Sequence, residues 1–196
     1  VPRKDTPAKV DGSAEFGADV ALEGKLFAAL RTSPVYGGEI VSDNRDALLS
    51  NPGVVAITNV DGGIAVIADT FWQAKKAAEL LDVEWDFKGG DSLNSHDMWE
   101  EMRASLTDEA RPFFGTKGDA PATIESATKV FEADYEVPFL AHACMEPMAS
   151  TAMVTDTTCQ MWSPHQQQDR AREEAAKITG LPLKDVQLQN TFAGGG

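Results

Sequence analysis

Two apolar runs separated by a turn dipeptide constrain the fold of this chain more than any other feature. Val54–Val60 and Gly63–Ala68 flank Asp61-Gly62, and Asp-Gly is favoured in the tight turns of β-hairpins. Thr70 then follows as a candidate N-cap for a helix over Phe71–Leu81. The residues predicted to form the apolar face of this helix are Phe71, Ala74, Ala78 and Leu81. A hairpin beside an amphipathic helix predicts a small α+β unit.

Shorter segments extend this unit and indicate a second one. Strands are predicted over Leu26–Arg31, Glu39–Ser42, Val83–Phe87, Thr151–Val154, Cys159–Trp162 and Val186–Thr191, and helices over Arg45–Ser50, Ser92–Ser105 and Gln168–Thr179. The last helix is predicted to place Ala171, Ala175 and Ile178 inward. In Val130–Val137 apolar residues alternate with acidic ones, which predicts a half-buried strand. The predicted boundaries are residues 1–87, a connector over 88–127, and an incomplete second unit over 128–196.

Composition limits the partners that this chain can have. Its 17 basic and 31 acidic residues give a net charge of −14, whereas nucleic-acid binding needs clustered Lys and Arg. No nucleic-acid partner is therefore expected. No membrane segment is expected in this chain either, because no apolar run approaches the roughly 18 residues that a spanning helix needs. The chain starts at Val1 without an initiator Met or a signal sequence. It is expected to start inside a longer protein, so both periplasm and cytoplasm stay open.

The cysteines and histidines carry no metal-binding pattern. Cys144 and Cys159 are the only cysteines and lack CxxC spacing, which excludes a cysteine-ligated iron–sulfur cluster or zinc ribbon within this chain. Two buried free thiols are predicted, and pairing in an oxidising compartment stays open. The histidines His96, His142 and His165 have no ligand spacing among them. No protein-ligated metal is expected.

Three features could carry chemistry. Glu146 follows an apolar stretch, and its carboxylate could act as a base or could satisfy backbone N–H groups. The turn Trp162–Gln168 leaves a strand and contains three glutamines. A glutamine amide there suits a neutral oxo or pterin group, or it could be exposed at the helix start. The terminal Gly194–Gly196 lets backbone N–H groups approach an anion or metal-bound oxygen closely, although such triplets are also common in linkers.

Together, in this order and at this spacing, these features resemble the xanthine dehydrogenase/aldehyde oxidase family. Four segments resemble its α/β hammerhead domain: Arg3–Gly17, Arg31–Val35, Gly53–Val55, and Ile64–Phe71 followed by Val83–Asp86. Four more resemble the start of its molybdopterin-binding domain: Tyr135–Ala143, Met145–Met148, Trp162–Gln166 and Thr191–Gly196. The subgroup that this chain resembles most is the large (beta) subunit of isoquinoline 1-oxidoreductase-type enzymes.

The resemblance implies both a reaction and a site. The reaction is hydroxylation of an aldehyde or an N-heterocycle with water as oxygen source, and electrons leave through a small [2Fe–2S] subunit. The cofactor is molybdopterin, in its cytosine dinucleotide form. Gln166 matches the family's glutamine near an oxo ligand, and Gly194, Gly195 and Gly196 match the first half of its GGGFG loop. Glu146 is supporting structure, and His165 lies beside the pocket.

The same resemblance implies limits on what this chain does by itself. The family's base glutamate lies downstream, so no catalytic residue is expected within these 196 residues, and the chain alone is expected to hold no cofactor and to be inactive. Two alternatives remain. A non-catalytic scaffold or partner-binding module with the same fold would show a stop codon directly after Gly196. A dinucleotide-binding protein is disfavoured because GxGxxG is absent and no helix follows the glycines.

Overall fold

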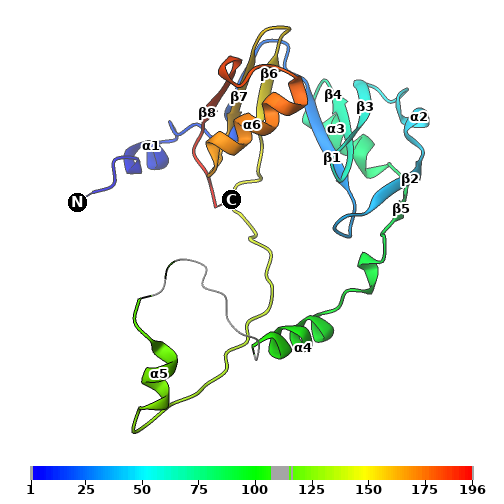
Figure 1. Ribbon diagram of the computed structural model, residues 1–196. Helices are drawn as coiled ribbons and strands as arrows, with labels where there is room; N and C mark the ends of the chain where they lie inside the picture. The colour runs from blue at the N-terminus through cyan, green and yellow to red at the C-terminus, as the bar shows by residue number, and fades with distance from the viewer. Residues whose placement is uncertain (1, 107–114, 116, 196) are drawn as a thin grey trace. The chain divides into compact units, whose positions relative to one another are not determined.

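The computed structural model describes residues 2–106, 115 and 117–195 (Figure 1). Its contacts divide the chain into two compact units, one of residues 24–132 and the other of residues 1–23 together with 133–196. Both units mix helices and strands, which confirms the α+β class. The contacts place residues 1–23 with the second half of the chain. The boundaries 1–87, 88–127 and 128–196 describe family domains rather than packing, and they stay a prediction.

The predicted hairpin forms the centre of the first unit. Strand β4 (Gly63–Ala68) lies between β1 (Phe27–Thr32) and β3 (Val54–Val60), and both neighbours run antiparallel to it. Ile64 and Val66 of β4 are completely buried. Helix α3 (Phe71–Glu79) contacts β1 and β4 and begins at Thr70, whose hydroxyl accepts the Gln73 N–H. The hairpin and helix predicted from the sequence are therefore confirmed.

The predicted apolar face of helix α3 is wrong at one residue, Phe71. Phe71 is 54% exposed, whereas Ala74, Ala77, Ala78 and Leu81 are buried. These four have the spacing i, i+3, i+4 and i+7, which completes an apolar stripe without Phe71. Because three of the four are alanines, the helix backbone can lie close to the sheet. The prediction missed Ala77 and wrongly included Phe71.

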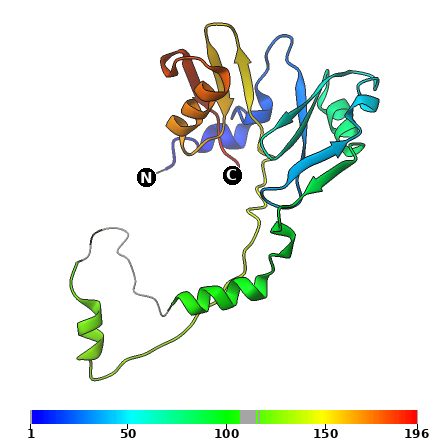
Figure 2. The ribbon, with the colours of Figure 1, turned by 45° about the vertical axis from the view of Figure 1, so that its right-hand side comes forward.

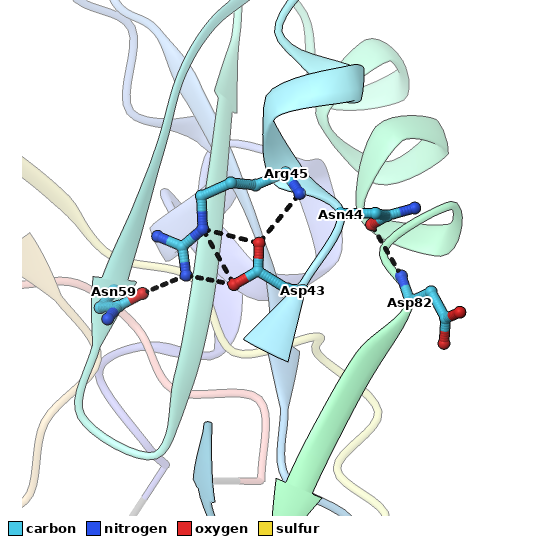
Figure 3. A network of polar contacts seen from close by, with 5 residues as sticks. All are labelled: Asp43, Asn44, Arg45, Asn59 and Asp82. Atoms are coloured by element: carbon cyan, nitrogen blue, oxygen red, sulfur yellow. Dashed lines mark hydrogen bonds and ion pairs between the residues drawn. The ribbon is translucent and has the colours of Figure 1, made fainter. Parts of the chain in front are cut away.

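A polar network joins the smaller sheet of this unit to strand β3 of the larger sheet. Strand β2 (Glu39–Asp43) pairs antiparallel with β5 (Val83–Asp86), and the short α2 (Arg45–Leu48) follows β2. Figure 3 shows Arg45 between the Asp43 carboxylate and the Asn59 side chain. Arg45 Nε donates to both Asp43 oxygens, at 2.8 and 3.0 Å, and Nη2 donates to Asn59 Oδ1 at 2.6 Å. Nearby, Asn44 Oδ1 accepts the Asp82 N–H at 3.0 Å.

We expect Asp43→Asn to destabilise this unit in a pH-dependent way. The Arg45 hydrogen bonds lower the pKa of Asp43, whose side chain is 8% exposed. Removing the charge should lower the free energy of unfolding by about 2 kcal/mol at pH 7. Because the pKa of Asp43 is lower in the folded state than the unfolded value of about 3.9, its ionised carboxylate stabilises the folded state fully at a pH above that value. This contribution is lost as the pH falls through the folded-state pKa. Urea unfolding at pH 7 and pH 3 measures the difference between variant and wild type.

The matched control for this variant is Asp61→Asn, which changes an exposed carboxylate and keeps a turn dipeptide suited to the hairpin. We expect it to change the stability little at either pH. A difference between Asp43→Asn and wild type that stays constant down to pH 3 would contradict the role assigned to the ion pair.

The segment after β5 contains two helices whose positions differ from the prediction. Helix α4 (Ser95–Ser105) begins three residues later than predicted, because Asn94 accepts the Asp97 N–H at 3.0 Å and caps the helix there. The 3-10 turn η2 (Gly90–Ser92) precedes it. Helix α5 (Ala120–Glu125) was not predicted, although Asp119 caps it and proline occupies its first turn. Asp before Ala-Pro is a helix-start signal that was overlooked when residues 88–127 were predicted to be a connector.

The second unit contains a three-stranded sheet in the order β6–β7–β8 (Figure 2). Strands β6 (Thr151–Val154) and β7 (Cys159–Ser163) are antiparallel, whereas β7 and β8 (Val186–Asn190) are parallel. Helix α6 (Gln168–Thr179) and the 3-10 turn η3 (Leu183–Asp185) connect the parallel strands. The β7–α6–β8 segment is thus a βαβ unit, with Cys159, Ala175 and Val186 forming its core.

Two sequence predictions in the second half of the chain are wrong. Ile178 is 85% exposed, and Ala176 packs against the core beside Ala175 instead. The predicted strand Val130–Val137 carries no regular secondary structure, and Phe131, Tyr135 and Val137 are 75–89% exposed. An isolated strand cannot pair its backbone N–H and C=O groups, and the described residues supply no neighbouring strand for it. Apolar alternation alone did not reveal whether a partner strand is present.

The N-terminal residues pack in the second unit, and the two cysteines differ in burial. Helix α1 (Thr6–Asp11) and the 3-10 turn η1 (Gly17–Asp19) belong to the second unit. Both cysteines are free thiols, with Cys159 buried and Cys144 only partly buried, so the prediction of two buried thiols holds for one of them. Within residues 2–106 and 117–195, no helix is long and apolar enough to cross a membrane.

Candidate functional site

The parallel pairing of β7 and β8 brings two of the predicted site segments to the same edge of the sheet. Ser163 at the end of β7 is in register with Asn190 at the end of β8, and Thr191 N–H donates to the Ser163 carbonyl at 3.3 Å. Gln166 lies three residues after β7, and Gly194 lies four residues after β8. Ligands of open sheets commonly bind at the carboxyl ends of parallel strands.

The turn that carries Gln166 is held by hydrogen bonds of its neighbours. His165 N–H donates to Asn190 Oδ1 at 2.9 Å, which joins the turn to the end of β8. His165 Nδ1 accepts the Gln167 N–H at 2.9 Å, and Gln168 Nε2 donates to the His165 carbonyl at 2.8 Å. Gln166 itself is exposed. His165 therefore has local structural contacts, and Asn190, which was not predicted as a site residue, positions the turn.

Glu146 makes direct contact with the C-terminal glycines. Its Oε2 accepts the Gly194 N–H at 2.6 Å, and its Oε1 accepts the Gly17 N–H at 3.2 Å. The Glu146 N–H in turn donates to the Gly194 carbonyl at 3.3 Å. Each carboxylate oxygen thus accepts a backbone N–H. These contacts match the structural role considered for Glu146 and are not those of a general base facing an open pocket.

The N-terminal residues contact the same loop, which the sequence did not indicate. Phe192 N–H donates to the Glu15 carbonyl at 3.1 Å, and Phe16 and Phe192 form an isolated parallel bridge with ring centroids 6.0 Å apart. Lys9 Nζ lies 5.0 Å from the Phe192 ring centroid. We call residues 192–195 the glycine loop and residues 15–17 the N-terminal segment. They are far apart in sequence, so no local pattern could reveal that they touch.

The glycine loop allows close approach to its backbone. A Cβ on Gly194 would lie 2.4 Å from the Glu146 Cβ, so only glycine fits there without movement. Gly195 has φ +116° and is exposed, and its N–H has no hydrogen-bond partner among the described residues. A backbone N–H and a glutamine amide exposed at one edge of the sheet can both donate to oxygen acceptors of a ligand. Gly196, the third predicted glycine, lies outside the described residues.

An open hollow borders this edge of the sheet. It measures about 350 Å³ and is lined by Glu15, Trp162, Gln189, Asn190, Thr191 and Phe192. The Thr191 hydroxyl is buried and has no hydrogen-bond partner among the described residues. The hollow therefore combines a wall from the N-terminal segment with the ends of both parallel strands.

Comparisons with known proteins show what this chain is similar to. Residues 106–196 match the family model for the molybdopterin cofactor-binding domain. Over 99% of its length, the chain is 26% identical to the aldehyde oxidoreductase molybdenum-binding subunit PaoC of Escherichia coli K12. Over its whole length, it is 26% identical to the isoquinoline 1-oxidoreductase beta subunit of Brevundimonas diminuta. The chain is thus similar, over nearly its whole length, to molybdenum-binding subunits of the xanthine dehydrogenase/aldehyde oxidase type, and residues 106–196 match a molybdopterin cofactor-binding domain. It spans only 30% and 26% of those two relatives.

Solved structures of similar fold support the architecture. The aldehyde oxidoreductase of Desulfovibrio gigas matches all of this chain with a TM-score of 0.70 at 22% identity, and the chain covers 26% of that protein. Quinoline 2-oxidoreductase of Pseudomonas putida 86 matches with a TM-score of 0.69 at 19% identity, and 30% of it is covered. These two likenesses concern the fold alone, and the non-catalytic scaffold is not favoured because the matching relatives are named as oxidoreductase subunits.

The region matched by the family model contains only part of the candidate site. Glu146, Gln166 and the glycine loop all lie within the matched residues 106–196, whereas the N-terminal segment precedes them. The contacts of Glu15, Phe16 and Gly17 therefore add residues from outside the matched region to the same edge of the sheet.

Proposed function

We propose that this chain forms part of the molybdopterin-binding subunit of a molybdenum-dependent oxidoreductase that oxidises aldehydes or N-heterocycles with water as oxygen source. One observation carries the proposal. The parallel β7–β8 pair places the Gln166 turn and the glycine loop at the same edge of a domain whose sequence matches the molybdopterin cofactor-binding family. The names of the relatives, an aldehyde oxidoreductase subunit and an isoquinoline 1-oxidoreductase subunit, support this substrate class.

The residues at this edge have separate roles in the proposal. The exposed Gly195 N–H donates to acceptors of the cofactor, and the Gln166 amide hydrogen-bonds to a neutral oxo group. We propose the same donor role for Gly196 from its place in the sequence alone. His165 and Asn190 hold the Gln166 turn, and Glu146 holds Gly194. When bound, the cofactor supplies the two-electron redox centre. Because both Glu146 oxygens accept backbone N–H groups, we assign Glu146 no role as a catalytic base.

The form of the cofactor and the partner are further parts of the proposal. We propose the cytosine dinucleotide form of molybdopterin and a small [2Fe–2S] subunit that receives the electrons. A [2Fe–2S] cluster takes four cysteine ligands, but this chain has two cysteines, one of them buried. Several relatives are named as molybdenum-binding subunits, which supports an enzyme of more than one chain.

The test uses the protein that carries this sequence, purified from its natural host with any associated subunit. We expect about one molybdenum per copy by elemental analysis, CMP after hydrolysis of the cofactor, and oxidation of benzaldehyde or isoquinoline. In water labelled with oxygen-18, the new oxygen of the product should carry the label. A preparation without molybdenum, or a product with unlabelled oxygen, would refute the proposed activity. The 196-residue chain by itself should retain no molybdenum, and stoichiometric metal there would show that it needs no further contacts.

A further inference from the structure

We propose that Glu146 is a positioning residue that joins the glycine loop to the N-terminal segment and so sets the conformation of the loop before any cofactor binds. Only the statement that the glycine loop binds a cofactor rests on the proposed function. The contacts themselves join three stretches of the chain, since Glu146 lies 129 residues after Gly17 and 48 residues before Gly194.

The geometry at Glu146 is that of a bridge. Its two carboxylate oxygens accept different backbone N–H groups, one from the N-terminal segment and one from the glycine loop. The return hydrogen bond from the Glu146 N–H to the Gly194 carbonyl makes the contact with the loop two-sided. Only an ionised carboxylate presents two acceptor oxygens to two donors in this way, because an amide replaces one acceptor with a donor.

Close packing fixes both ends of the bridge. A Cβ on Gly17 would lie 2.1 Å from the Ala149 carbonyl oxygen, and a Cβ on Gly194 would lie 2.4 Å from the Glu146 Cβ. Glycine at both positions allows the two backbones to reach the same carboxylate. Neither end can move away from Glu146 without breaking a charge-assisted hydrogen bond.

A second contact reinforces the bridge two residues before Gly194. The Phe192 N–H donates to the Glu15 carbonyl, and the Phe16 and Phe192 rings pack at 6.0 Å between centroids. The N-terminal segment therefore holds the glycine loop through its own backbone and ring as well as through Glu146. The loop and the segment should open together, because they share both contacts.

Hydrogen–deuterium exchange of the purified protein, followed by mass spectrometry, tests this coupling. The variant is Glu146→Gln, and the readout is exchange in two peptides, one covering residues 12–20 and one covering residues 188–196. We expect both to exchange about tenfold faster or more, since one charge-assisted hydrogen bond is lost and a donor then faces a donor. Glu173→Gln, an exposed carboxylate on α6, is the matched control and should change neither peptide.

The second variant, Phe192→Leu, tests the coupling from the loop side. It removes the ring contact and keeps an apolar side chain, so it should fold even where Glu146→Gln does not. We expect faster exchange in residues 12–20, which the substitution does not alter. Faster exchange confined to residues 188–196 in either variant would overturn the proposal, as would faster exchange throughout α6 and β7, which would indicate general unfolding. These readouts need no bound cofactor, so a protein without molybdenum would refute the proposed function and leave this inference standing.

Discussion

In the proposed enzyme, replacing Gly194 with alanine should prevent retention of the molybdenum cofactor. The new Cβ would lie 2.4 Å from the Glu146 Cβ and 3.1 Å from its Oε2, so either the loop or Glu146 must move. Overpacking of this kind costs about 1–3 kcal/mol, and loss of the Gly194 hydrogen bond to a charged group adds about 1.5–3 kcal/mol. We expect the molybdenum content of the purified protein to fall below roughly one tenth of the wild-type value, because the loop donors are displaced.

The matched control for this variant is Gly115→Ala. An added Cβ there meets nothing within 4 Å, and the position lies outside the unit that contains the glycine loop. Its molybdenum content should equal that of wild type. Normal metal content in Gly194→Ala would show that the loop does not hold the cofactor, and the assignment of Gly195 and Gly196 as donors would then be wrong.

Replacing Gln166 with alanine should lower the turnover of the enzyme by about a hundredfold while leaving the fold intact. One well-placed neutral donor near a reacting oxygen typically contributes a factor of about 10²–10³ in kcat. Hydrogen bonds of His165, Gln167 and Gln168 hold the turn, and the substitution alters none of these residues. Steady-state kinetics with an aldehyde substrate, together with the circular dichroism spectrum and the molybdenum content, separates a loss of chemistry from a loss of structure.

Gln167→Ala is the control on the same turn. The Gln167 side chain is exposed, and its backbone N–H, which donates to His165 Nδ1, is kept in the variant. Turnover should stay within about twofold of wild type, as is usual for surface substitutions away from a site. If Gln167→Ala lost turnover and Gln166→Ala did not, the glutamine that contacts the cofactor would be the neighbouring one.

The local signals in the sequence predicted most of the regular elements. Asp61-Gly62 indicated the hairpin, and the limits of β3, β4, β6 and α6 agree with the prediction. Helices α1 and α5 were missed, although a proline in the first turn marks both. Val130–Val137 failed for a different reason. Its alternation has the period of a strand, but a strand also needs a neighbour, and sequence period carries no information about neighbours.

The candidate site was also predictable from the sequence only in part. The sequence indicated Glu146, Gln166 and the glycines through their residue types and their resemblance to a family. It did not indicate that β7 and β8 are parallel, which is what places Gln166 and Gly194 at one edge. It also missed Asn190 and the N-terminal segment, because their contacts depend on chain topology. Residue chemistry was readable from the sequence, and the pairing of distant segments was not.

The second unit is built from both ends of this sequence, and this arrangement determines when its contacts can form during synthesis. Residues 24–132 form a unit whose contacts are complete before residue 133 is made. Gly17 must wait for Glu146, 129 residues later, which corresponds to a delay on the order of 10 s at ribosomal rates. Phe16 meets Phe192 later still. During this interval residues 15–17 lack their contacts with Glu146 and Phe192, so this side of the second unit forms late in synthesis.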